Sequence, residues 1–309
     1  MKQRILYIDN LKALAIISVV ISHVFWFSFG HNENVWSRLI STYYMPLFFF
    51  ISGAFAKDSM TLRHLGMKTK QLLLPFLTVG SLYTMLNSNW HELFYGMAHN
   101  GYWFLPTLFV LFVCFYLRCA LFQCIKILNC SLKVGFDIAY VIVLYGALKV
   151  LLGFIDQDIA SLLYLNRTHS YLLPFFCGFI IFNNKVHIKS LLNNFMPVLY
   201  AVCLPLYIIL FYMVYYAGLQ FPFSSYLLSF LSIFILFVYF RTLNINNSKI
   251  QNTISFVGRH TLEIYVIQYF YLPLSQNSLV LFSDGLGGKS TCSKCYRSCS
   301  GFGAQYSYY

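Results

Sequence analysis

The sequence predicts an all-helical bundle that crosses a membrane several times, with about nine membrane helices. Of its 309 residues, 59% are hydrophobic and only 10% are charged, and the mean hydropathy is +0.66. A soluble domain carries about 25% charged residues, so this chain has too few charges to cover a water-exposed surface. Long apolar runs in such a chain are typical of transmembrane helices.

The apolar runs account for the nine expected helices. A helix rises about 1.5 Å per residue, so roughly 20 residues cross about 30 Å of hydrocarbon. Most of the runs reach this length, and the sixth is short. In chain order they are Leu11–Phe29, Leu39–Ala56, Gln71–Leu86, Tyr102–Phe122, Val134–Phe154, Ser170–Phe182, Met196–Ala217, Ser224–Phe240 and Thr261–Phe282.

The basic residues between these runs indicate the orientation. With the N-terminus in the cytoplasm, the inner segments hold 15 Lys and Arg residues, the outer loops hold 3, and the C-terminal tail holds 3. An excess of basic residues on the cytoplasmic side is the rule for membrane proteins. Because these residues are spread among the connecting segments, the net charge of +12 does not indicate nucleic-acid binding.

The chain divides into a membrane domain, residues 1–282, and a tail, residues 283–309. The tail is rich in Gly, Ser, Cys and Tyr and has no helical period, so we expect it to be disordered or aberrant. Its Cys292, Cys295 and Cys299 lack a fourth ligand and a folded context, and we predict no metal site there. The first run is longer than a usual signal sequence, and we interpret it as an uncleaved helix.

Lys12 and His23 in the first run are the strongest candidates for chemistry. They are eleven residues apart, which is about three turns plus 20° and about 16 Å along a helix, so both project from one face. This places Lys12 at the cytoplasmic boundary and His23 near the bilayer centre. A histidine at that depth is costly and can move a proton near neutral pH. The alternative is a histidine that hydrogen-bonds a neighbouring helix as part of the packing.

Five short motifs follow one another along the membrane domain. They are Lys12 followed after ten residues by His23, Met45–Gly53, Lys68–Phe76, Tyr102–Leu105 with Leu108–Phe109, and Phe256–Tyr265. In this order, from about residue 5 to 282, the chain resembles the membrane-bound acyltransferase family 3, whose multi-span members O-acylate sugars of cell-surface polysaccharides. The family often has Arg at the position of Lys12, and many members have His at the position of Gln268. It commonly has ten helices, and we expect the last to be missing after Phe282.

The resemblance implies transfer of an acetyl group from acetyl-CoA to a hydroxyl of a surface polysaccharide or lipid-linked glycan, in a bacterial cytoplasmic membrane. His23 would act as a base or as an acyl carrier. Lys12 and a basic loop would hold the phosphates of the donor; for each loop residue the alternative is a charge that only sets topology. The basic residues of that loop are Lys57, Arg63, Lys68 and Lys70.

Besides Gln268, four further residues are candidates for a supporting role. Asp9 lies three residues before Lys12 and could pair with it. Glu263 could orient a cation or favour a helix N-terminus, and Trp103 could stack on a sugar or anchor the chain at the interface. Ser52, next to Gly53, more readily allows close helix packing than acts as a nucleophile.

Two other functions are compatible with the sequence. A transporter or flippase of a glycan intermediate or small solute also uses intramembrane His and Lys residues and broken helices, but transporters usually have paired repeats, which are not evident here. A non-catalytic membrane subunit is the third possibility. For the enzyme, the expected partners are the lipid bilayer, acyl-CoA and a glycan acceptor, without nucleic acid.

Overall fold

The structure is a computed structural model that describes residues 6–29, 34–87, 90–96, 99–125, 130–183, 185–219, 221–243 and 248–271. All regular elements among these residues are helices, which confirms the predicted all-helical class. The predicted tail, residues 283–309, lies outside the described residues, as does the second half of the last apolar run.

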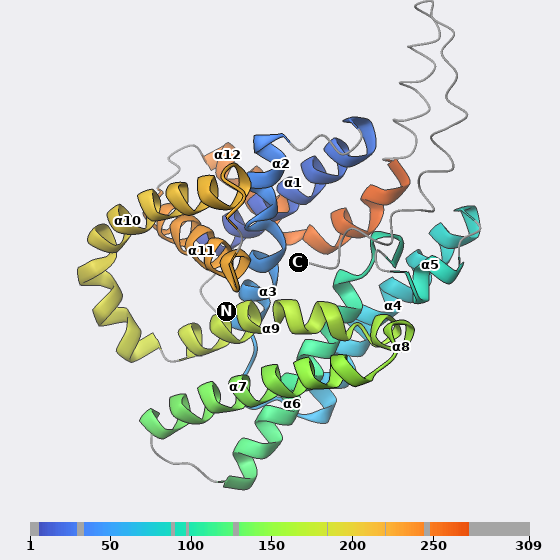
Figure 1. The fold of residues 1–309 in the computed structure, drawn as a ribbon, viewed down its shortest axis with the longest axis horizontal. Helices are drawn as coiled ribbons and strands as arrows, with labels where there is room; N and C mark the ends of the chain where they lie inside the picture. Colours follow the sequence, from blue (N-terminus) through green and yellow to red (C-terminus); the bar gives the residue numbers. More distant parts are fainter. Residues whose placement is uncertain are drawn as a thin grey trace, which may run out of the picture.

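The helices follow one another with short connections (Figure 1). They are α1 (Leu6–Phe29), α2 (Val35–Ser41), α3 (Tyr44–Ala54), α4 (Leu62–Asn87), α5 (Trp90–Phe94), η1 (His99–Gly101), α6 (Phe104–Ile125), α7 (Cys130–Phe154), α8 (Gln157–Leu162), α9 (Leu165–Asn183), α10 (Lys185–Tyr215), α11 (Ser224–Thr242), α12 (Ser248–Arg259) and a helix over residues 261–271.

Five helices of the described chain are long and apolar enough to cross a membrane. They are Leu6–Phe25, Phe104–Ile125, Leu132–Phe154, Pro197–Tyr215 and Ser224–Thr242. The expected total of nine stays a prediction. The runs Gln71–Leu86 and Ser170–Phe182 are helical within α4 and α9, whose remaining turns carry polar residues that lower their mean hydropathy.

One predicted span, Leu39–Ala56, is not a single helix. It is divided between α2 and α3, because α2 ends at Ser41 and α3 begins at Tyr44. The Thr42 hydroxyl donates a hydrogen bond of 2.8 Å to the Leu39 carbonyl and lies 2.9 Å from the Tyr207 hydroxyl. These bonds satisfy polar groups at the break, so the chain can turn inside the protein.

The short helix α3 lies at the centre of the bundle. In Figure 1 it lies between α1, α2 and α11 on one side and α9 on the other, and it packs against all four. A Cβ at Gly53 would lie 1.8 Å from the Phe175 carbonyl oxygen, and one at Gly178 would lie 2.0 Å from the Phe50 carbonyl oxygen. The backbones of α3 and α9 therefore touch, which is the small-residue packing expected of the Ser52–Gly53 pair.

Candidate active site

His23 is held by a tyrosine from the last described helix. Its Nε2 atom lies 3.2 Å from the Tyr269 hydroxyl oxygen, and the two ring centroids are 5.0 Å apart. The Tyr269 hydroxyl also donates a 2.9 Å hydrogen bond to the Gly101 carbonyl, which accepts a second bond of 2.6 Å from Tyr265. The other ring nitrogen, Nδ1, is buried and has no hydrogen-bond partner among the described residues.

Gln268 lies beside the His23 ring. Its side chain is buried, with 7% of the residue exposed. Neither atom of its amide group has a hydrogen-bond partner within the described part of the chain. Leaving a buried amide unpaired is unfavourable, so buried polar groups are nearly always bonded. The structure therefore brings together two of the residues predicted from sequence, and both present polar atoms that a substrate could satisfy.

Lys12 and Lys68 also come together. The Lys12 ammonium lies 5.2 Å from the centroid of the Phe55 ring, and the Lys68 ammonium lies 4.7 Å from that of Phe112. Burial and the positive charge of Lys12 lower the pKa of Lys68. Two like charges in a partly buried place repel each other, and a bound anion would relieve this repulsion. The pair is thus suited to a phosphate group.

The other basic loop candidates are solvent-accessible. Lys57, Arg63 and Lys70 are all exposed, in the α3–α4 connection and the first turns of α4. They lie on the segment that carries Lys68, and their contribution to anion binding stays a prediction.

The remaining helix candidates differ in burial. Asp9 is 8% exposed, and its carbonyl packs against Gly258 of α12. Glu263 is exposed near the start of the helix over residues 261–271, and Ser52 is partly buried on α3. A direct role for any of the three in acyl transfer stays a prediction.

Comparison with known families identifies the chain. A family model described as an acyltransferase domain, that of acyltransferase family 3, matches residues 5–287. The chain belongs to this family. Curated proteins and solved structures gave no match. The predicted resemblance is confirmed, and it makes the chain a membrane acyltransferase.

Trp103 of this acyltransferase belongs to an aromatic row inside the bundle. Its ring is nearly parallel to that of Tyr171, at 5.5 Å between centroids, and Tyr171 stacks on Phe49 at 4.4 Å. The Arg167 guanidinium carbon lies 4.7 Å from the Trp103 centroid. The ring thus already packs against protein groups. These contacts suit a structural role, and stacking on a sugar stays a prediction.

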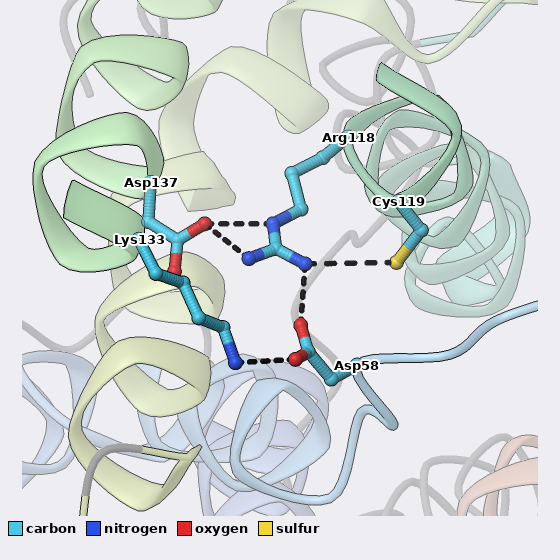
Figure 2. Close-up of polar contacts among 5 residues, drawn as sticks. All are labelled: Asp58, Arg118, Cys119, Lys133 and Asp137. Carbon is cyan, nitrogen blue, oxygen red and sulfur yellow. Dashed lines mark hydrogen bonds and ion pairs between the residues drawn. The ribbon is translucent and has the colours of Figure 1, made fainter. Parts of the chain in front are cut away.

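A buried ion cluster was missed by the sequence reasoning (Figure 2). Arg118 of α6 is fully buried, and its Nε donates a 2.7 Å hydrogen bond to Asp137 Oδ1 of α7. Its Nη2 binds the same oxygen, and its Nη1 lies 2.5 Å from Asp58 Oδ1 in the α3–α4 connection. Lys133 of α7 binds the other Asp58 oxygen. The cluster ties this connection to two helices.

The sequence did contain a signal for this cluster. From sequence alone, Arg118 and Lys133 count only as basic residues on the predicted cytoplasmic side, but Asp137 is an acidic residue inside an apolar run, where charges are costly unless paired. Burial opposes the ionisation of Asp58. The hydrogen bond from Lys133 and the charge and hydrogen bond of Arg118 outweigh that effect, so the pKa of Asp58 is lower than usual.

The described residues contain no group of three or more His, Cys, Asp or Glu side chains that could hold a metal ion. The three cysteines of the tail, Cys292, Cys295 and Cys299, lie outside the described residues.

Proposed function

We propose that this membrane acyltransferase transfers an acetyl group from acetyl-CoA to a hydroxyl of a lipid-linked glycan or surface polysaccharide. The membrane would be a bacterial cytoplasmic membrane, with the N-terminus in the cytoplasm. Membership of acyltransferase family 3 supports the reaction class. The observation that carries the proposal is the pair of His23 and Gln268, because Nδ1 of the imidazole and both amide atoms of Gln268 are buried without a partner in the described protein.

The donor would bind along α1. Lys12 and Lys68 would hold the phosphates of acetyl-CoA, because Lys12 is near enough for its charge to lower the pKa of Lys68, and two neighbouring ammonium groups form a cationic site. His23 follows on the same helical face, about 16 Å farther along the axis. A long flexible arm separates the phosphates of coenzyme A from its thioester, so a donor held at the lysines could extend its thioester toward His23.

His23 would act as a general base in direct transfer. Its neutral ring takes the proton of the acceptor hydroxyl while the hydroxyl oxygen forms a bond to the thioester carbonyl carbon. The carbon–sulfur bond then breaks, and the thiolate of coenzyme A takes the proton from the ring. In the carrier route the ring nitrogen attacks the thioester carbon and coenzyme A leaves as its thiolate, which gives an acyl-imidazole. The acceptor hydroxyl then attacks the acyl carbon, the carbon–nitrogen bond breaks, and the hydroxyl proton goes to the thiolate. The Gln268 amide, beside His23, would hydrogen-bond the reacting carbonyl or hydroxyl.

Reconstituted protein tests this function. Full-length protein in vesicles would receive acetyl-CoA with a labelled acetyl group and a membrane extract containing lipid-linked glycans, and the label in the glycan would be measured. We expect His23→Ala to reduce the rate by about a hundredfold or more, the usual contribution of a general base. His91→Ala, which removes an exposed histidine, is the matched control and should be unaffected. Equal rates for wild type and His23→Ala would rule out this role of His23.

A further inference from the structure

The His23 ring, the Tyr269 hydroxyl and the Gly101 carbonyl are joined by two hydrogen bonds that run in one direction. Tyr269 carries one hydroxyl proton, and a carbonyl oxygen can only accept a bond. The proton of Tyr269 therefore lies on the 2.9 Å bond to Gly101, and the Tyr269 oxygen accepts at its 3.2 Å contact with His23. The Nε2 atom of His23 must then carry a hydrogen. In a neutral ring this leaves the lone pair on Nδ1, the atom without a partner in the described chain.

The geometry of this chain is fixed by its surroundings. Tyr269 is 3% exposed, and its ring packs 4.9 Å from that of Tyr102 and 6.0 Å from that of Tyr265. Gly101 has a φ of +87°, a conformation that L side chains rarely adopt. A Cβ at Gly101 would lie 2.3 Å from the Tyr269 ring, so a glycine lets the tyrosine approach this carbonyl. The carbonyl is held again by the Tyr265 hydroxyl.

We propose that Tyr269 is a positioning residue that fixes the tautomer of His23, and that Nδ1 of His23 is the atom that takes the proton. This inference rests on the proposed function and adds which nitrogen reacts and why. When Nδ1 gains the proton of the acceptor hydroxyl, the ring becomes positive, and the bond from Nε2–H to Tyr269 becomes a charge-assisted one. Nδ1 then returns that proton to the thiolate of coenzyme A. Tyr269 orients the base as the third member of a catalytic triad does.

The opposite tautomer is disfavoured by the contacts of Tyr269. The Gln268 amide beside the ring can donate or accept, so it fits either tautomer. With the hydrogen on Nδ1, the lone pairs of Nε2 and of the Tyr269 oxygen would face each other. Relief of that repulsion would require Tyr269 to turn its proton away from Gly101. The Gly101 carbonyl thus sets the tautomer of His23 by fixing the direction of the Tyr269 hydroxyl that lies between them.

The chain offers a matched control. Tyr265 donates to the same Gly101 carbonyl from the same helix, whereas the hydroxyl that contacts His23 is that of Tyr269. Tyr269→Phe and Tyr265→Phe therefore each remove a hydroxyl that donates to the Gly101 carbonyl. Only Tyr269→Phe also removes a bond to the imidazole. In reconstituted full-length protein, we expect Tyr269→Phe to lower kcat about tenfold to a hundredfold without raising KM for acetyl-CoA. Tyr265→Phe, whose lost hydroxyl contacts Gly101 and Tyr269 but not the imidazole, should lower kcat by less than Tyr269→Phe does. Equal kcat values for the two variants would overturn the role of Tyr269.

Replacement of His23 by Nδ1-methylhistidine tests the reacting atom. The methyl group blocks Nδ1 and leaves Nε2 with the lone pair. We expect a loss of activity as large as that of His23→Ala, about a hundredfold or more. Activity near that of wild type would overturn the assignment of Nδ1. If His23→Ala were inactive at the same time, the proposed function would stand and only the assignment would fall.

The tautomer can also be measured without any activity. Nitrogen-15 NMR of histidine-labelled protein, with the His23 signals assigned by their loss in His23→Ala, separates protonated from bare ring nitrogens. We expect a protonated Nε2 and a bare Nδ1 in wild type and Tyr265→Phe, and a changed ratio in Tyr269→Phe. A protonated Nδ1 in wild type, or an unchanged ratio in Tyr269→Phe, would overturn the inference. Should wild type transfer no acyl group, the proposed function would fall while this spectrum still decides the tautomer.

Discussion

Two buried polar clusters in this acyltransferase are built in opposite ways. Around Arg118, all three guanidinium nitrogens have oxygen partners, both Asp58 oxygens are bound, and only Asp137 Oδ2 lacks a bond among the described groups. Around His23, the ring atom Nδ1 and both amide atoms of Gln268 lack partners in the same part of the chain. The first cluster satisfies nearly all of its own charges, and the second presents polar atoms to something else.

This difference in hydrogen bonding indicates that the Arg118 cluster has a structural role and that the His23 cluster has a role in catalysis. A satisfied ion cluster connects α6, α7 and the α3–α4 connection, and its removal should act mainly on stability. Unsatisfied buried groups lower stability, and each calls for a partner such as a ligand or an ordered water. Substitutions in the two clusters should therefore have different measured effects.

The largest effect on stability is expected at Arg118. Arg118→Leu would leave Asp137 buried without its cation, whereas Asp58 is partly exposed and keeps Lys133. Breaking a buried ion pair costs about 3–5 kcal/mol. The measurement is the free energy of unfolding in detergent micelles, by titration with a denaturing detergent. His23→Ala, which removes one hydrogen bond, should change it by only about 1 kcal/mol. Restoration of stability in the double variant Arg118→Leu with Asp137→Leu would support the charge explanation. An unchanged free energy in Arg118→Leu would contradict it.

A second buried histidine sharpens the comparison. His99 is 2% exposed, and its Nδ1 donates a 2.9 Å bond to the Leu93 carbonyl. Burial lowers the pKa of His99 to about 4, with the bond to Leu93 acting against this and the charge of Arg167 adding to it. The unfolded chain takes up this proton near pH 6.5. The contribution to stability is therefore complete above that pH and declines as the pH falls toward 4.

The total decline would be about 3 kcal/mol, from 1.36 kcal/mol for each pKa unit. Unfolding measured from pH 7.5 to 4 checks this. In His99→Phe the new side chain does not titrate, so this part of the fall in the free energy of unfolding with falling pH should be lost. The same slope in the variant and in wild type would assign the pH dependence to other groups.

A smaller effect, on the binding of acetyl-CoA, is expected at Lys12 and Lys68. Lys12→Ala and Lys68→Ala should each raise KM for acetyl-CoA by about tenfold with little change in kcat, because they remove uniform binding energy. Lys12→Arg should restore binding, since a guanidinium also holds phosphate. Lys149→Ala, at an exposed lysine of α7 outside the basic loop, is the control. A fall in kcat at constant KM would place the lysines in the chemical step instead.

Part of this account follows from the sequence and part does not. The helical class and the family were predictable, because composition and motif order are local properties. The common face of Lys12 and His23 stays a prediction. The break between α2 and α3 was not predictable, since hydropathy does not detect a polar turn satisfied by the distant Tyr207. The contact of His23 with Tyr269 joins residues 246 positions apart, so only the packing reveals it. For the ion cluster, the sequence can single out Asp137, but only the packing shows its partners from the other segments.

One comparison of rates tests the central claim directly. The acetyl-transfer rate of each folded molecule would be measured for wild type, His23→Ala and Arg118→Leu in vesicles, with the folded fraction determined separately. The account predicts a folded His23→Ala protein with almost no transfer, and a less stable Arg118→Leu protein whose folded fraction transfers at nearly the wild-type rate. Transfer at the wild-type rate by His23→Ala would contradict it.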